Sequence, residues 1–266
     1  MLTFFEICVK ICRKIFPDFL YKKCVMLCRK IFPESILYIY DKKMGYRKYD
    51  DIEKMQLSNK FSYIYREGIW SSGDKEIDFY SGTGSHNLNI INPYIKGVIE
   101  FLAGQNRKLD VVDLGCGDYN IGSQIRPYTR KYVACDIVQE LIERNKINYS
   151  NTETEFRLVN IVDDDLPEGE VVFLRQVLQH LSNSDIIKIL PKLMKYKILI
   201  LTEHIPSNIG FKPNKDFVSG PGIRLERNSG IVITKPPFNL LYKESEEVCS
   251  VEERGGKIVT TIYKLK

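Results

Sequence analysis

The sequence predicts an α/β fold: a doubly wound, mostly parallel sheet of seven strands that ends in an antiparallel hairpin, with a helical appendage at the N-terminus. Two observations carry this prediction. Five apolar runs of strand length alternate with helical segments between residues 109 and 204, which is typical of right-handed βαβ units. Two further strand-like runs within 244–265 flank Gly255-Gly256, a hairpin signal.

The composition fits one large globular domain with an appendage. The chain has 266 residues, of which 44% are hydrophobic and 27% charged, as is usual for soluble proteins. Residues 1–48 hold eleven Lys/Arg and four Asp/Glu, a net +7 against +5 for the whole chain, which leaves −2 for residues 49–266. A groove that follows nucleic acid needs clustered cations, so no nucleic-acid partner is expected for the main domain.

The appendage, residues 1–48, contains a repeat. CVKICRKIFP (8–17) and CVMLCRKIFP (24–33) agree at eight of ten positions. Each copy predicts a short amphipathic helix that stops at a proline. Two interpretations stay open: a peripheral contact with a membrane surface, or a helical cap or homodimer contact. The paired cysteines four residues apart are interpreted as small apolar residues, because no histidine lies near them to complete a metal site.

The cysteine count and the missing targeting signals predict a cytoplasmic protein. Seven cysteines are an odd number, and no secretory signal precedes them, which favours a reducing compartment. No run of about 18 apolar residues predicts a membrane span. The expected location is therefore the cytoplasm, with peripheral contact at the inner membrane face through residues 1–48 as an open alternative.

The elements of the main domain, 49–266, are expected in a simple order. The loop YSGTGSHN (80–87) precedes an amphipathic helix at 92–104, which ends near Gly104. The expected strands are 109–114, 131–137, 154–161, 169–176 and 197–204, and the expected helices among them are part of 121–130, then 139–148, then one that begins near Ser182 or Asp185.

A long irregular insertion is expected at 205–243, between the fifth strand and the hairpin. Long irregular segments at a ligand face are often lids or substrate loops, so this one is expected to form part of an acceptor site. Its prolines are Pro206, Pro213, Pro221, Pro236 and Pro237.

The turn that follows the first strand, DLGCGDYN (113–120), predicts a nucleotide-type ligand with a positive tail. A dinucleotide fingerprint would have a glycine where this chain has Asn120. Asp113 and Asp118 would repel a pyrophosphate at this turn but would suit a cationic amine. Asp136, at the end of the second strand, is placed to accept both hydroxyls of a ribose. S-adenosylmethionine meets all of these conditions, and a nicotinamide-dependent enzyme is the weaker alternative.

On these residues the sequence resembles the class I S-adenosylmethionine-dependent methyltransferases, which have a Rossmann-like sheet. The resemblance covers about residues 60–266 and is carried by VVDLGCGD (111–118), VACDIV (133–138), LVNIVDDDLP (158–167) and FLRQVLQHLSN (173–183). The sequence is also similar to a bacterial subgroup associated with surface-polysaccharide gene sets.

The resemblance implies a set of cofactor contacts. The turn would hold the methionine part, the second strand the ribose, the third the adenine and the fourth again the methionine part. Asn160 departs from the family, which usually has an aspartate there. The implied residues are Asp113, Gly115, Cys116 and Gly117, then Asp136 and Ile137, then Asn160 and Ile161, then Arg175 and Gln176.

Three residues are the candidates for catalysis. His180 follows the fourth strand and is interpreted as a base or substrate contact, with a histidine bonded to the backbone as the alternative. Glu203 and His204 end the fifth strand. Neighbours in a strand point to opposite faces, so the two would share a target only if the strand had already ended.

The acceptor is expected to contact the 80–87 loop and the insertion. Ser81, Thr83 and Ser85 have hydroxyls and nearby backbone N–H groups that suit an anion, with a flexible turn as the alternative. Arg224 is a candidate for an acceptor phosphate or a surface arginine. Trp70 is either a core residue or a ligand contact.

These observations together predict an S-adenosylmethionine-dependent methyltransferase without a metal. The expected acceptor is a hydroxyl of a sugar or of a sugar- or phosphate-linked precursor of a bacterial surface glycan. The alternatives are N-methylation of a small molecule, or a non-catalytic assembly module at a membrane face.

Overall fold

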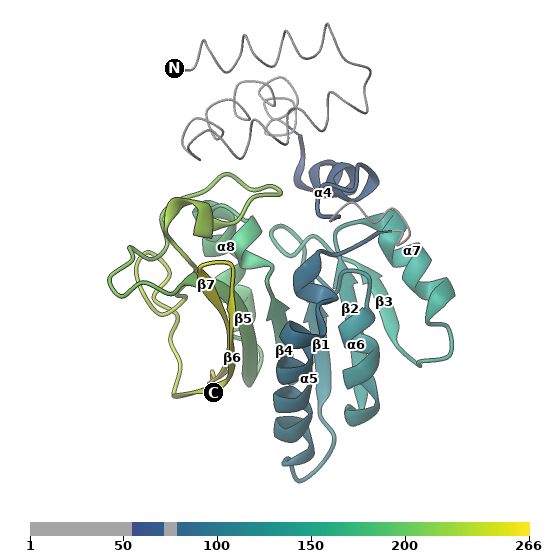
Figure 1. The fold of residues 1–266 in the computed structure, drawn as a ribbon. Coiled ribbons are helices and arrows are strands. Elements are labelled where there is room, and N and C mark those ends of the chain that lie inside the picture. Colours follow the sequence, from purple (N-terminus) through teal and green to yellow (C-terminus); the bar gives the residue numbers. More distant parts are fainter. Residues whose placement is uncertain (1–54, 72–78) are drawn as a thin grey trace, which may run out of the picture. The chain divides into compact units, whose positions relative to one another are not determined.

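The computed structural model describes residues 55–71 and 79–266 (Figure 1). The repeat in residues 1–48 lies outside the described residues, so its helices, its membrane or homodimer contact, the domain boundary after residue 48 and the cytoplasmic location stay predictions. Among the described residues, no helix is long and apolar enough to cross a membrane. No group of three His, Cys, Asp or Glu in the same part of the chain is placed to hold a metal ion.

Seven strands form one sheet in the order β3-β2-β1-β4-β5-β7-β6 (Figure 1). Five are parallel, and β7 runs antiparallel to both β5 and β6. The predicted fold class is confirmed. The strands are β1 (Asp110–Leu114), β2 (Lys131–Asp136), β3 (Glu155–Leu158), β4 (Val171–Arg175), β5 (Ile198–Pro206), β6 (Glu244–Glu253) and β7 (Gly256–Lys264).

The strand order reverses between β1 and β4. The chain builds outward from β1 through β2 to β3, then returns to place β4 on the other side of β1. In such sheets the connections leave a crevice at the carboxyl ends of the strands where the order reverses. The sheet topology therefore places the candidate site above β1 and β4.

Helices cover both faces of the sheet, and the two-residue period of the strands divides the core between them. Val111 and Phe173 pack in a cluster with residues of α5, whereas Val112 and Leu174 pack in a second cluster with residues of α8. The helices are α4 (Leu57–Arg66), α5 (Leu88–Ala103), α6 (Asn120–Ile125), α7 (Gln139–Asn148) and α8 (Asn183–Leu193).

Several element boundaries differ from the sequence predictions, and the structure gives a reason for three of them. The helix expected at 92–104 begins at Leu88, where the Asn87 side chain caps it by accepting from Asn89 N at 3.0 Å. The third strand ends at Leu158, because the chain turns at Asn160, whose carbonyl accepts from Asp164 N at 2.8 Å. The fifth strand continues to Pro206, because β7 pairs with it along its whole length.

The segment between β5 and β6 is irregular, as predicted, and contains one short 3₁₀ turn, Arg224–Arg227. Asn214 organises it. This buried amide donates to the carbonyls of Val232, Lys235 and Pro236 at 2.9, 3.2 and 3.0 Å and accepts from Val232 N at 2.8 Å. Side-chain bonds to the backbone thus replace the hydrogen bonds that a helix would supply.

The closing hairpin is also confirmed. Its two turn residues are Arg254 and Gly255, both with positive φ (42° and 72°), as a tight hairpin requires. Gly256 already belongs to β7.

Candidate functional site

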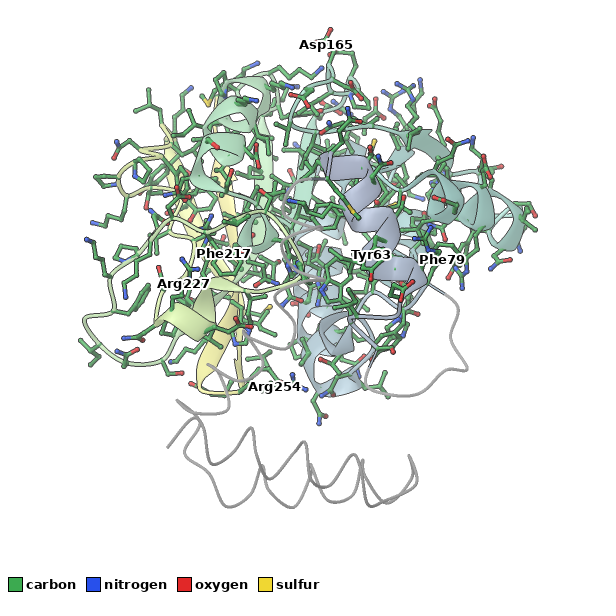
Figure 2. The ribbon with its side chains drawn as sticks, turned by 90° about the horizontal axis from the view of Figure 1, so that it is seen from above. Tyr63, Phe79, Asp165, Phe217, Arg227 and Arg254 are labelled. Carbon is green, nitrogen blue, oxygen red and sulfur yellow. The ribbon has the colours of Figure 1, made fainter. Side chains whose placement is uncertain are left out.

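A cavity of about 530 Å³ lies at the carboxyl ends of the parallel strands, within the usual range for small-molecule sites. The glycine turn (residues 113–118) and the ends of β2 and β4 form its floor. Its walls come from α4, the 81–85 loop and residues 221–226. Seen from above, α4, which carries Tyr63, lies over this end of the sheet, and Phe217 and Arg227 mark the irregular segment (Figure 2).

The two glycines of the turn allow close approach to the cavity floor. Gly115 and Gly117 have φ values of 78° and 55°, which a residue with a Cβ rarely adopts. A Cβ on Gly115 would lie 2.5 Å from Val177 Cγ2, and one on Gly117 would lie 2.5 Å from Ser81 Oγ. Val177 and Ser81 can therefore pack against the turn only because both residues are glycine. Cys116 lies between them and also lines the cavity.

Asp136 is fixed at the end of β2 by backbone donors. Its carboxylate accepts from Gly117 N and from Val138 N, both at 3.1 Å, so the acid and the glycine turn are held together. Burial raises the pKa of Asp136 to about 6. A carboxylate in this position suits a pair of vicinal hydroxyls, as predicted for a ribose.

Asp113 is the carboxyl at the other end of the turn. It lines the cavity, is 8% exposed and accepts from Tyr132 Oη at 2.9 Å. Burial raises its pKa to about 7. Removal from water disfavours the charged form, so a cationic ligand group beside Asp113 would restore its negative charge.

Asp118 does not share this role, which corrects the sequence interpretation. It does not line the cavity, and its carboxylate contacts His86 Nε2 at 2.6 Å, Ser81 N at 3.2 Å and Asn120 N at 3.1 Å. These partners use both oxygens. Of the two carboxylates expected at a cationic amine, only Asp113 lines the cavity.

The 81–85 loop lines the cavity, but it packs against the glycine turn. Asp118 N donates to Ser81 Oγ at 2.9 Å, and Asn120 Nδ2 donates to the Ser85 carbonyl at 2.8 Å. Ser81, Thr83 and Ser85 all line the cavity, on the side of the glycine turn. Their binding of the acceptor stays a prediction.

Arg175 and Gln176 end β4 next to this loop. Arg175 Nη2 donates to the Gly84 carbonyl at 2.5 Å, and its guanidinium lies 5.0 Å from the centre of the Tyr94 ring. Gln176 has φ 55°, and a Cβ on Gly84 would lie 2.3 Å from its Oε1. Both residues line the cavity, as expected for residues beside a methionine moiety.

The adenine side is apolar, and Asn160 is not part of it. Ile137, Val159 and Ile161 line the cavity. The Asn160 side chain instead accepts from Val162 N at 3.0 Å and donates to Asp163 at 2.9 Å. The departure from the family pattern at Asn160 thus forms a local turn, and the assignment of its amide to the adenine edge is corrected.

His180 faces the cavity in a neutral form. Its Nδ1 donates to the Gly222 carbonyl at 3.0 Å, its Nε2 accepts from Gln179 Nε2 at 3.3 Å, and its ring lies 5.0 Å from that of Trp70. Burial lowers the pKa of His180 to about 4. Trp70 lines the cavity too, and its Nε1 donates to the Pro221 carbonyl at 3.1 Å.

Glu203 and His204 point to opposite faces of β5, as the strand period requires. Glu203 does not line the cavity; its Oε1 accepts from Leu178 N at 3.1 Å, and burial raises its pKa to about 8. The prediction that it acts directly in catalysis is corrected. His204 lines the cavity, with Nε2 2.9 Å from the Glu253 carbonyl.

Arg224 is a buried structural residue rather than a phosphate ligand. It is 1% exposed, donates to the Lys215 carbonyl at 2.6 Å and contacts the Leu181 carbonyl. These bonds fasten the irregular segment to the turn after β4. The phosphate-binding assignment is corrected.

Several cavity residues were not identified from the sequence. Phe61 and Tyr65 come from α4, whose apolar residues have helical spacing, a signal that could have been used. Ile223 and Glu226 come from the irregular segment and Arg254 from the hairpin turn. No local pattern marks these three, because they reach the cavity only through the tertiary fold.

The sequence matches no protein-family profile and no curated protein, but solved structures share its fold. Magnesium protoporphyrin IX methyltransferase ChlM from Synechocystis PCC 6803, solved with bound SAM, is 14% identical, with a TM-score of 0.51 over 79% of this chain and 98% of its own. N-methyltransferase NodS from Bradyrhizobium japonicum WM9, in complex with S-adenosyl-L-homocysteine, is 11% identical, with a TM-score of 0.53 over 77% and 99%. DhpI in complex with SAH is 15% identical, with a TM-score of 0.50 over 80% and 97%.

These neighbours are class I S-adenosylmethionine-dependent methyltransferases, and the chain has their fold. None of them supports the narrower likeness to the polysaccharide-associated subgroup, which stays a prediction.

Proposed function

We propose that the chain is an S-adenosylmethionine-dependent methyltransferase. One observation carries the proposal: the buried Asp136 carboxylate is bonded to Gly117 N, so a hydroxyl-binding acid and a glycine cradle meet on one cavity. Asp136 would hold the ribose, Asp113 the amine, and Ile137 and Ile161 the adenine. The donor set fits the cofactor, because the cavity offers one acid to the amine, a second acid to the ribose and an apolar wall to the adenine.

The cofactor supplies a methyl group that is already activated, so the protein has to align the acceptor and exclude water. Residues Trp70 and His180 form the wall on the side of α8, and residues 221–223 close it. His180 would contribute its ring to this wall, because its one acceptor nitrogen, Nε2, already accepts from Gln179 Nε2 at 3.3 Å.

Binding of S-adenosylhomocysteine tests the proposal. The wild-type chain is expected to bind it in calorimetry, and Asp136→Ala to bind at least about tenfold more weakly, because hydrogen bonds to a charged group are lost. Asp165→Ala, which removes an exposed acid far from the cavity (Figure 2), is the control. No binding by the wild type, or equal affinity in Asp136→Ala with its fold intact, contradicts the proposal.

For the acceptor we propose a hydroxyl of a sugar or of a sugar-linked glycan precursor. The supporting features are an aromatic wall at Trp70 and the wall contributed by the 207–243 segment, which suit a polar ring compound. The burial of Arg224 removes the feature that favoured a phosphate-linked acceptor.

N-methylation of a small molecule is the second candidate, and one observation favours it. His180 is uncharged and weakly basic, and Glu203 lies outside the cavity, whereas a neutral amine needs no base before it attacks. Mass spectrometry of the purified protein with methyl donor and matched panels of neutral sugars and amines separates the two, because only one panel should gain a methyl group.

A further inference from the structure

The 81–85 loop is fastened to the glycine turn by reciprocal bonds that involve Asp118. The backbone N of Asp118 donates to Ser81 Oγ at 2.9 Å, and the Asp118 carboxylate accepts from Ser81 N at 3.2 Å. The same oxygen lies 2.6 Å from His86 Nε2, just beyond the loop. A short contact between a buried carboxylate and an imidazole is among the stronger hydrogen bonds in proteins.

Both members of the His86–Asp118 pair are packed against other residues. The Asp118 side chain is 5% exposed, and that of His86 is 22% exposed. The His86 ring stacks on Tyr80, with ring centres 4.4 Å apart and planes 20° from parallel. Without His86 the Asp118 carboxylate would keep only the N–H groups of Ser81 and Asn120, in a place that water barely reaches.

The loop in turn holds Arg175. Its Nη2 donates to the Gly84 carbonyl at 2.5 Å, and its Nε is buried with no partner among the described residues. Arg175 lines the cavity and faces Asp113 across the ends of β4 and β1. A guanidinium on a cavity wall recognises an anion, and the α-carboxylate is the anion of the proposed cofactor.

We propose that His86 and Asp118 are positioning residues for the amino-acid end of the cofactor. Their pair fastens the 81–85 loop to the glycine turn, and the loop, through the Gly84 carbonyl, holds Arg175 where it takes the α-carboxylate. The inference rests on the proposed function and deepens it, since it assigns the two residues to one half of the ligand.

Two ligands that differ in this half test the proposal in calorimetry on the full chain. S-adenosylhomocysteine has the amino-acid tail, and 5′-methylthioadenosine lacks it. His86→Ala and Asp118→Ala are expected to weaken S-adenosylhomocysteine about tenfold, as for a lost charge-assisted bond, and to leave 5′-methylthioadenosine unchanged. His86→Gln, whose amide can donate to Asp118, should recover part of the loss.

Arg157→Gln is the matched control, because it removes a different side-chain contact to a carboxylate, Arg157 to Glu155 at 2.6 Å, outside the cavity. If His86→Ala and Asp118→Ala weaken both ligands equally, or weaken neither, the positioning role is overturned while the proposed function stands. Failure of the wild type to bind either ligand overturns the proposed function and this inference with it. Should Asp118→Ala not fold, His86→Ala gives the same comparison, because His86 lies outside the turn.

Discussion

At the residue scale, the protonation of Asp113 and Asp136 is expected to make the affinity for the cofactor depend on pH. Burial raises their pKa values to about 7 and about 6, above the value of roughly 4 expected in the unfolded chain. Their protonated forms therefore favour folding, and this contribution to stability is lost as the pH rises from about 4 to 7. In their charged form these two acids lower the folding stability, and a ligand that binds the carboxylates offsets this loss.

The affinity for S-adenosylhomocysteine is therefore expected to rise between pH 5.5 and 8. Below its pKa each carboxyl is protonated and must lose its proton to bind the amine or the ribose as a carboxylate. The affinity therefore rises by up to about tenfold per pH unit for each group. Calorimetry across this range measures it. Asp113→Asn should bind weakly and lose the rise near pH 7, while the rise near pH 6 from Asp136 remains. A wild-type affinity that is flat or falls with pH would contradict the assignment.

At the scale of elements, the irregular 207–243 segment connects β5 to β6 in place of a helix. The hydrogen bonds of the Asn214 side chain stabilise its conformation. Asn214→Ala removes four hydrogen bonds of a residue that is 5% exposed. It is expected to lower the free energy of unfolding by about 2–4 kcal/mol, because several hydrogen bonds that tie the segment together are lost at once and the truncated side chain leaves a gap.

The measurement is denaturant unfolding, with Asn228→Ala as the control. Asn228 shares the left-handed backbone (φ 48°, against 56° for Asn214) but is exposed and makes no side-chain hydrogen bond within the described structure. Equal losses in the two variants would mean that the backbone conformation, and not the amide, holds the segment.

At the scale of the whole molecule, the sequence was enough to predict the sheet and the cofactor side of the cavity. Strand periodicity located all seven strands. The order of Asp113, the glycines and Asp136 indicated the ligand, because the first three share one turn and Asp136 ends the next strand along the chain. The roles of Asp118, Asn160, Glu203 and Arg224 were not predictable in this way. Each depends on a partner distant along the chain or on a local turn, such as the Leu181 carbonyl for Arg224.

The division of the chain into an appendage and a main domain leads to the last prediction. Every residue that lines the described cavity comes after residue 56, so a chain without residues 1–48 is expected to bind S-adenosylhomocysteine with the affinity of the full chain. The net +7 of the deleted segment should give the full chain, and not the shortened one, an attraction to anionic vesicles, which sedimentation with vesicles measures. Equal vesicle binding by both chains would leave the homodimer contact as the role of the repeat, to be checked by the mass of each chain in solution. Loss of S-adenosylhomocysteine binding in a folded, shortened chain would show instead that the appendage contributes to the cofactor site.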